Sequence, residues 1–401
     1  MLVSLFSAKA RLWLRGRQGI LTHMEQAAWQ MAKEQDPKPV IWFHCASLGE
    51  FEQGRPVIEQ FRKDFPNWCI LLTFFSPSGY EVRKEYAQAD HVFYLPVDTP
   101  ANVSSFLNIW KPAMAVFVKY EFWFNYLHAL QQRQIPLYFV SSVFRPGQHF
   151  FKWYGGWSLR HLRSVTRIFV QDAYSARLLS DHGVLNVSQS GDTRFDRVFT
   201  LMQSPVQFPL VKEFSEGHRV IVAGSSWPAD EALLESLTLD NVRFIIAPHE
   251  VHNERVRNLM QRWKGKAIRF SELKEGVPAD AKALVIDTIG MLSSLYQYGD
   301  MALIGGGFGK GIHNTLEAAT FGLPVLFGPN YEKFTEAREL IALGGAFCVR
   351  SPEEFQNRVN YLLAYEDRLK EVSETCRQYV IGQKGATQVI MDELRLKAAD
   401  Y

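Results

Sequence analysis

Short apolar runs alternate along this chain with longer stretches in which apolar residues recur every three or four positions. Apolar runs of about 4–8 residues bounded by turn-forming residues predict buried strands, and the longer spacing predicts helices. In the first half, the predicted strands cover residues 40–46, 68–75, 91–96, 113–119, 135–142 and 167–171. In the second half, they cover residues 219–226, 242–250, 282–288, 301–307 and 323–328. This alternation predicts, in each half, a parallel sheet with helices on both faces.

The same pattern divides the chain into four parts. Residues 1–37 are a basic amphipathic helical segment, and residues 38–202 form a first α/β domain. Residues 203–217 hold two prolines and no sustained period, which is typical of a linker. Residues 218–401 form a second α/β domain, whose last helix we expect to cross back to the first. Two such domains normally enclose a cleft, which is the default ligand site.

Composition narrows the classes of protein to consider. A net charge of +2 gives no global attraction for nucleic acid, so we expect no nucleic-acid partner. The four cysteines, Cys45, Cys69, Cys348 and Cys376, form no CxxC pair, which indicates buried thiols in a reducing compartment and no zinc site. No apolar run approaches the roughly 18 residues of a membrane-spanning helix.

The first 24 residues are locally basic. Lys9, Arg11, Arg15 and Arg17 precede the first acid, Glu25, and alternate with leucines and aromatic residues. Two interpretations remain open: a basic amphipathic helix on an anionic membrane surface, or a helix that packs on its own domain.

Residues 300–330 contain the most suggestive stretch. An apolar run at 301–304 predicts a strand, three glycines follow at 305–307, and residues 313–321 have helical spacing. A strand, a glycine turn and a helix N-terminus together favour an anion, which predicts a ligand that carries phosphate. The alternative is that the glycines serve tight packing, because GGGFGKG matches neither the dinucleotide nor the Walker pattern. His313, Asn314 and Glu317 add polar groups, and Glu317 is suited to a ribose diol.

Other predicted strands of the second half also end in polar or small residues. These are Ser225 and Ser226 in GSSWPADE, His249 in APHE and Thr288 in DTIGM. The chain has no HExxH, no DxD pair and no Cys/His ligand set, so we expect no catalytic metal and no cofactor.

In the first half, ASLGE places Glu50 just after a strand and at the start of a helix. A carboxylate there suits a general base, although it equally suits a helix N-terminal acid. Lys119, Glu121 and Trp123 in KYEFWFN follow a second strand and would bind a sugar or orient Glu50, unless the aromatic residues only face the core. Arg145 would hold an anionic group or lie in solvent.

Taken together, the motifs resemble those of the 3-deoxy-D-manno-octulosonic acid (Kdo) transferases. The resemblance covers about residues 38–365 and rests on the order of ASLGE, TFFSPSGYE, YLPVD, KYEFWFN, GDTRFD, AGSSWPADE, APHE, VIDTIGM and GIHNTLEAATFGLPVLFGPN. It implies an α/β fold of the GT-B class, with two Rossmann-like domains that face a cleft. It also implies metal-independent, inverting transfer of Kdo from CMP-Kdo to the lipid A precursor in lipopolysaccharide synthesis. The partners implied are this donor, this acceptor and the anionic cytoplasmic face of the inner membrane.

The resemblance also implies roles for individual residues. Glu50 would be the general base and Glu121 its neighbour, with Lys119, Trp123 and Arg145 at the acceptor or the transition state. The residues that would bind CMP-Kdo are Ser225, Ser226, His249, Thr288, Gly290, Met291, Gly306, Gly307, His313, Asn314 and Glu317.

Three departures from the family pattern stand out. An apolar membrane anchor is common at the start of family members, whereas here the start is basic and amphipathic; SSVFRPGQ replaces a more usual Asn-Ala-Arg pattern; and GGGFGKGIHN lacks a proline-arginine insertion. The alternatives are another GT-B enzyme, such as a nucleotide-sugar epimerase or a UDP-sugar transferase, and a non-catalytic nucleotide-binding scaffold.

Overall fold

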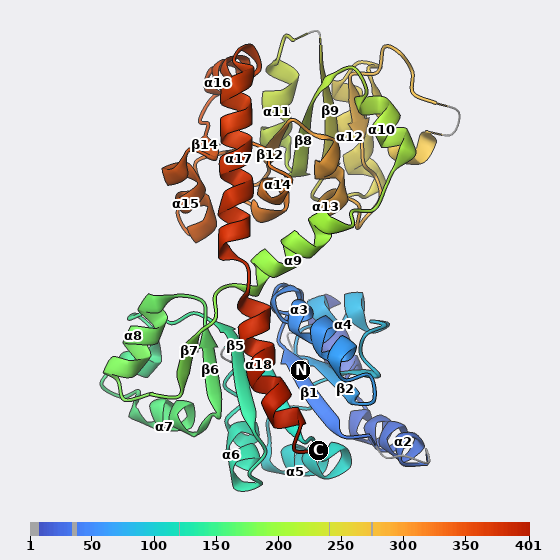
Figure 1. Ribbon diagram of the computed structural model, residues 1–401. Coiled ribbons are helices and arrows are strands. Elements are labelled where there is room, and N and C mark those ends of the chain that lie inside the picture. The colour runs from blue at the N-terminus through green and yellow to red at the C-terminus, as the bar shows by residue number, and fades with distance from the viewer. Residues whose placement is uncertain (1–7, 34–37, 120, 240, 274–275) are drawn as a thin grey trace. The chain divides into compact units, whose positions relative to one another are not determined.

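The computed structural model describes residues 8–33, 38–119, 121–239, 241–273 and 276–401. The chain folds into two compact units, Met1–Arg197 together with Lys384–Tyr401, and Val198–Gln383 (Figure 1). The chain passes from one unit to the other within α9 (Thr193–Gln203), and returns after α17 (Glu366–Gln383). Whether the two units enclose a cleft stays a prediction.

Among the described residues, the first unit holds a seven-stranded sheet in the order β3-β2-β1-β4-β5-β6-β7, with every pair parallel. The strands are β1 (Val40–Cys45), β2 (Cys69–Phe74), β3 (His91–Tyr94), β4 (Met114–Val118), β5 (Leu137–Ser142), β6 (Arg167–Val170) and β7 (Val187–Gln189). The strand order reverses between β1 and β4, and the carboxyl ends of strands at such a point are where open α/β sheets bind ligands.

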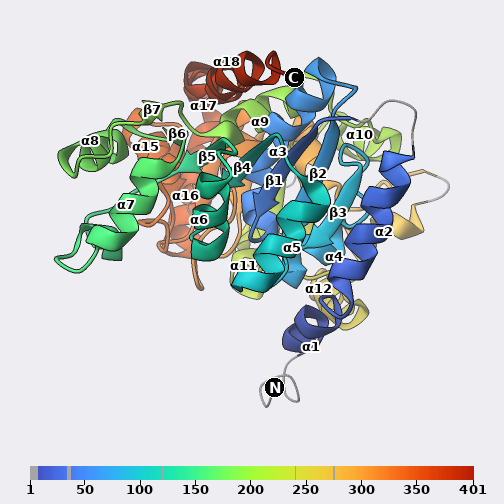
Figure 2. The same ribbon diagram turned by 90° about the horizontal axis from the view of Figure 1, so that it is seen from below.

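Helices cover both faces of this sheet, which explains its continuous apolar runs. Successive residues of β1 show the two faces: Trp42 packs in a core with α2, α5, α6 and α7, whereas Phe43 packs in another with α3 and α18 (Figure 2). The helices are α1 (Ala8–Arg15), α2 (Ile20–Ala32), α3 (Leu48–Asp64), α4 (Pro77–Arg83), α5 (Pro100–Trp110), α6 (Phe124–Gln132), η2 (His149–Phe151), α7 (Gly156–Ser164), α8 (Ala173–Asp181) and α18 (Ala386–Ala398).

The last helix, α18, belongs to the first unit. Ile390, Met391 and Leu394 are fully buried in the same core as Phe43. The Asp196 carboxylate accepts hydrogen bonds from the backbone N–H groups of residues 385 and 387, each at 2.6 Å, and so caps the start of the helix.

The second unit repeats the arrangement. In the described part of this unit, the sheet has seven parallel strands in the order β10-β11-β9-β8-β12-β13-β14. The strands are β8 (Arg219–Ser226), β9 (Val242–Pro248), β10 (Ala267–Arg269), β11 (Ala283–Val285), β12 (Met301–Ile304), β13 (Val325–Phe327) and β14 (Ala346–Cys348). The helices are α10 (Pro209–Ser215), α11 (Pro228–Ser236), α12 (Asn253–Arg262), η3 (Phe270–Glu272), α13 (Leu292–Leu295), η4 (Tyr296–Tyr298), α14 (Leu316–Thr320), α15 (Thr335–Leu343), α16 (Pro352–Ala364) and α17.

Several predicted boundaries differ from the structure. Residues 203–217, expected to be a linker, lie in the second unit and include α10, whose Val211 and Phe214 are fully buried. Pro209 is the first residue of this helix rather than a break, a position where its missing N–H costs nothing. The short edge strands β7, β10 and β14 were not predicted, because three residues, most of them partly exposed, leave too weak an apolar pattern.

The N-terminal segment forms α1 and α2, while residues 1–7 and 34–37 of it lie outside the described residues. Across the described chain, no helix combines the length and the apolar character that a bilayer crossing requires. All four cysteines are free thiols.

Candidate functional site

Glu50 lies in the first turn of α3, directly beyond the carboxyl end of β1. Its Oε2 accepts a hydrogen bond from the backbone N–H of Ser47 at 3.1 Å, which is the reciprocal half of a capping box. Burial raises the pKa of the Glu50 carboxyl, and the charge of Lys119 and the N–H groups of Ala46 and Ser47 partly oppose the rise. The carboxylate therefore caps the helix and is also held beside a cation.

Lys119 follows β4, the neighbour of β1, in a strained backbone conformation with φ of 63°. Its N–H donates to the Val140 carbonyl at 2.8 Å, and its own carbonyl accepts from the Ser142 hydroxyl at 3.1 Å, so β5 holds the strained residue on both sides. A left-handed non-glycine residue costs on the order of 1–3 kcal/mol, and such residues concentrate at functional sites.

Glu121 is the most perturbed carboxyl of this cluster. Burial, and then the charge of Glu50, raise its pKa to about 7, against the opposing effects of Lys119 and the Trp123 indole. Two carboxyl groups that interact in this way titrate as a pair. The more strongly bonded Glu50 is the one that ionises first, and Glu121 retains a proton up to about neutral pH.

A buried hydrogen-bond chain fixes Trp123. Its Nε1–H donates to His44 Nε2 at 3.0 Å, which leaves the proton of a neutral imidazole on Nδ1, 2.9 Å from Thr73 Oγ1. Burial lowers the pKa of His44 to about 3, so the ring is neutral at physiological pH. Thr73 also accepts from the Trp42 indole at 2.8 Å. Sequence reasoning missed His44, although a histidine inside the apolar run VIWFHCA was the available signal.

Trp13 of α1 and Arg17, in the turn after it, pack against the same end of the sheet. The Arg17 guanidinium donates to the carbonyls of Phe75 and Leu95, each at 2.9 Å, and lies 4.1 Å from the Trp13 ring centroid. Phe75 in turn lies 4.5 Å from Trp123 between ring centroids. These contacts support the alternative in which this part of the segment packs on its own domain, although no residue of α1 is buried.

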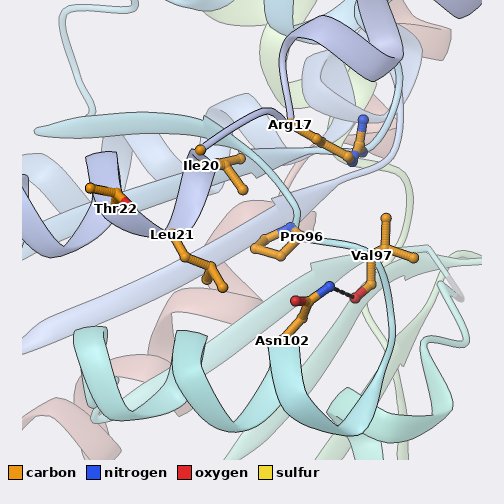
Figure 3. A pocket seen from close by; sticks show the side chains of 8 residues that line it. Arg17, Ile20, Leu21, Thr22, Pro96, Val97 and Asn102 are labelled. Carbon is orange, nitrogen blue, oxygen red and sulfur yellow. Dashed lines mark hydrogen bonds between the residues drawn. The ribbon is translucent and has the colours of Figure 1, made fainter.

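A small pocket of about 190 Å³ lies beside this junction (Figure 3). It is lined by Arg17, Gly19, Ile20, Leu21, Thr22, Pro96, Val97 and Asn102. Among these, the charged group is Arg17, whose hydrogen bonds are already made, and Asn102 donates to the Val97 carbonyl at 2.9 Å. The pocket therefore offers little to a charged substrate. Arg145 is exposed in the loop after β5, and its role stays a prediction.

In the second unit, the three glycines after β12 serve packing first. A Cβ on Gly305 would lie 2.2 Å from the Ser225 carbonyl oxygen, and one on Gly307 would lie 2.5 Å from the Gly328 nitrogen. The Gly306 N–H donates to Asp230 Oδ2 at 3.0 Å. This amide is therefore already hydrogen-bonded to a buried carboxylate, and the predicted place of Gly306 in the donor site stays a prediction.

The helix after the turn is also shorter than expected. Instead of residues 313–321, α14 spans Leu316–Thr320, too short for a strong helix-dipole contribution to anion binding. Asn314 Nδ2 donates to Glu317 Oε1 at 3.1 Å, and Asn314 Oδ1 accepts from the Leu316 N–H at the same distance. Asn314 therefore holds the Glu317 carboxylate beside the start of α14.

Three rings stack beside this turn. The centroids of His249 and His313 are 4.4 Å apart, those of Trp227 and His249 are 4.9 Å apart, and Trp227 Nε1 donates to His313 Nε2 at 3.3 Å. Burial, and then His249, lower the pKa of His313. The structure thus brings together two histidines predicted from separate motifs and adds Trp227, which sequence reasoning passed over within GSSWPADE.

The other predicted donor-site residues lie at the end of β8 and in the segment after β11. Ser225 has a left-handed backbone with φ of 52°. The hydroxyl of Ser226 is buried and donates a hydrogen bond to Glu231 at 2.8 Å, so its part in binding a ligand stays a prediction. Thr288 Oγ1 lies 2.9 Å from the Met291 sulfur across the turn that contains Gly290, whose φ is 90°.

Comparison with known proteins gives concordant results. A family model described as 3-deoxy-D-manno-octulosonic-acid transferase matches residues 19–197. A 3-deoxy-D-manno-octulosonic acid transferase from Haemophilus influenzae is 27% identical over 384 residues, covering 90% of this chain and 87% of its own. One from Aquifex aeolicus is 27% identical over 356 residues, covering 85% and 90%.

Solved structures share the fold. A UDP-GlcNAc 2-epimerase from Neisseria meningitidis superposes with a TM-score of 0.61 at 18% identity, over 89% of this chain and 99% of its own. A MurG from Acinetobacter baumannii superposes with a TM-score of 0.54 at 14% identity, over 90% and 99%. The prediction of two parallel-sheet domains of the GT-B class is confirmed.

Proposed function

We propose that this chain, which belongs to the Kdo transferase family, transfers Kdo from CMP-Kdo to the lipid A precursor in lipopolysaccharide synthesis. The observation that carries the proposal is the similarity to named Kdo transferases along 85–90% of the chain. The site geometry supports it, because each unit holds a cluster of the kind its part of the reaction needs.

The first unit supplies the base. Glu50, ionised beside Lys119, takes the proton from an acceptor sugar hydroxyl as the hydroxyl oxygen attacks the anomeric carbon of Kdo. Glu121, with a pKa of about 7, keeps its proton at slightly acid pH and donates a hydrogen bond to an acceptor oxygen. Two neighbouring carboxyl groups with different pKa values can take different roles, because one is ionised and acts as a base while the other is protonated and donates a hydrogen bond.

The second unit holds the donor. The stacked rings of Trp227, His249 and His313 give a face of aromatic and polar character, suited to the base or the sugar of a nucleotide. Glu317, fixed by Asn314, accepts from the ribose hydroxyls. In one displacement the bond from the anomeric carbon to the CMP phosphate oxygen breaks as the new glycosidic bond forms, with inversion and with CMP as the leaving group.

The reaction is proposed to need no metal and to occur at the cytoplasmic face of the inner membrane, where the acceptor lies. Activity undiminished by EDTA is the expected result for the first point. A strict magnesium requirement would overturn it.

Glu50→Gln tests the assignment of the base. Glutamine retains the capping interaction with Ser47, so the fold is expected to persist. The variant is expected to bind CMP-Kdo as the wild type does, by calorimetric titration, and to lose transfer by a factor of about 10²–10⁴. The matched control is Glu52→Gln, at a position on the same helix as Glu50. It removes ion pairs with Arg83 and Arg197 and is expected to retain transfer. Near-normal turnover by Glu50→Gln would remove Glu50 from this role.

A second candidate is a nucleotide-sugar epimerase, favoured by the fold similarity to UDP-GlcNAc 2-epimerases. Incubation with UDP-GlcNAc separates the two functions. If the protein is a Kdo transferase, UDP-GlcNAc is expected to be recovered unchanged.

A further inference from the structure

Asp230, in the first turn of α11, carries a carboxylate that is fully buried. In the described part of the chain, its Oδ1 has no hydrogen-bond partner and no arginine or lysine forms an ion pair with it. Burial raises the pKa of this carboxyl, and the N–H groups of Gly306 and Trp227 oppose the rise. Buried polar atoms of native proteins are nearly always paired, so an unpaired carboxylate oxygen calls for an explanation.

The neighbouring acid, Glu231, is also fully buried but is bonded differently. It accepts a hydrogen bond from the Ser226 hydroxyl at 2.8 Å and forms an ion pair with Arg255 of α12. These contacts tie α11 to the end of β8 and to α12, and Asp230 takes no part in them. The role of Asp230 is therefore a different one.

One oxygen of Asp230 joins two segments of the second unit. Its Oδ2 accepts from the Trp227 N–H at 2.9 Å and from the Gly306 N–H at 3.0 Å. The first bond caps α11, as an acid at this helix position commonly does. The second is not a capping contact, because Gly306 lies in the turn after β12, the strand adjacent to β8 (Figure 1). Asp230 thus fixes the segments that follow two neighbouring strands relative to each other.

Both segments carry rings of the stack described above. Trp227 directly follows β8. The turn that contains Gly306 leads back to the end of β12, since the His313 N–H donates to the Gly305 carbonyl at 3.1 Å. The Trp227 indole Nε1–H then donates to His313 Nε2 at 3.3 Å. Asp230 therefore holds the backbone on both sides of this indole–imidazole contact.

The contact decides where the proton of His313 lies. An indole N–H can only donate, so Nε2 of His313 accepts, and the proton of the neutral imidazole is on Nδ1. His249 stacks on His313 with ring centroids 4.4 Å apart, and burial together with His249 lowers the pKa of His313. His313 is thus a neutral ring whose N–H donor is Nδ1.

We propose that Asp230 is a positioning residue of the candidate CMP-sugar site: by joining Trp227 to the Gly306 turn, it keeps His313 in place as the Nδ1-protonated tautomer. Asp230 acts through these residues and touches no ligand. The acceptor oxygen is what matters rather than the negative charge, because a single oxygen makes both hydrogen bonds. The nature of the ligand rests on the proposed function, whereas the tautomer of His313 does not.

Nitrogen NMR of histidine-labelled full-length protein at pH 8 tests the tautomer without any ligand. His313→Gln identifies the signal, which in the wild type is expected to report a proton on Nδ1. Trp227→Phe removes the indole donor, and Asp230→Ala removes the oxygen that positions it, so both are expected to lose this preference. Asp230→Asn is expected to retain it, because the amide oxygen can accept both hydrogen bonds.

Calorimetric titration with CMP measures the consequence for binding. Asp230→Ala is expected to raise the Kd about tenfold or more, and Asp230→Asn by no more than about threefold. Glu235→Gln is the matched control, since it removes an ion pair with Arg262 on the same helix, and it is expected to bind as the wild type does. Equal melting curves verify the fold. If Asp230→Ala does not fold, Asp230→Ser, whose shorter side chain cannot bridge the two N–H groups, takes its place.

The outcomes separate this proposal from the proposed function. A wild-type His313 protonated on Nε2, an unchanged tautomer or Kd in Asp230→Ala, or an Asp230→Asn variant as impaired as Asp230→Ala would each overturn the positioning role. A wild type that binds no CMP, while Asp230→Ala still shifts the tautomer, would support the positioning role and contradict the proposed function.

Discussion

Replacing Glu121 with glutamine is expected to stabilise the protein at alkaline pH and not at acid pH. The pKa of Glu121 is about 7 in the folded protein against 4.5 for an ordinary glutamate, so the fold prefers the protonated form. The stability that this preference contributes is fully present below pH 4.5 and is lost as the pH rises through 7. Glu121→Gln mimics the protonated form at every pH.

The magnitude follows from the difference of 2.5 between these pKa values. At about 1.4 kcal/mol for each pKa unit, an isolated group would change the free energy of unfolding by roughly 3.5 kcal/mol. Partial exposure and the coupling to Glu50 reduce this, and we expect a gain of about 1–2 kcal/mol at pH 8. For a unit of this size that corresponds to roughly 2–8 °C in melting temperature.

Scanning calorimetry at pH 5, 6, 7 and 8 measures the difference between Glu121→Gln and the wild type. The difference is expected to be small at pH 5 and to grow up to pH 8. Glu85→Gln, at an exposed position on the same unit, is the control and is expected to show no such trend. A difference independent of pH, or one that grows towards acid pH, would refute the placement of a protonated carboxyl beside Glu50.

Three further predictions concern the remaining contacts. His44→Phe removes the hydrogen-bond acceptor of the Trp123 indole and is expected to lower the free energy of unfolding in urea by about 1–3 kcal/mol and to lower kcat. An unchanged kcat would show that the hydrogen bonds from Trp123 through His44 to Thr73 have no part in catalysis. Gly305→Ala is expected to destabilise the second unit by about 1–3 kcal/mol, whereas Gly309→Ala, whose Cβ would meet the nearest atom at 3.6 Å, is expected to be neutral in the same melts. Glu317→Ala is expected to raise the KM for CMP-Kdo about tenfold or more with a smaller effect on kcat, and an unchanged KM would exclude a ribose contact.

The sequence predicts the fold well where strands are buried on both faces. The run VIWFHCA becomes β1 because both faces are covered, and each alternate residue enters a different core. The edge strands β7, β10 and β14 escape prediction because their pairing depends on the neighbouring strand rather than on their own three residues. Pro209 contributed to the wrong prediction of a linker, because a proline is equally typical of a chain break and of the first residue of a helix.

The candidate site is predictable where position along the chain decides the geometry. Glu50 follows a strand and begins a helix, so its place at the sheet edge follows from the local pattern. The hydrogen bond of the Gly306 amide could not be predicted from the local pattern, because its acceptor, Asp230, lies 76 residues away in sequence. The partnership of Trp123 with His44, separated by 79 residues, is set by the same long-range packing.

The most direct test of the central claim is incubation with CMP-Kdo and the lipid A precursor, followed by mass spectrometry of the lipid. The proposed function predicts a lipid whose mass rises by one or more Kdo units, with release of CMP, for the wild type and not for Glu50→Gln. An unmodified lipid and intact CMP-Kdo with the folded wild-type protein would contradict it.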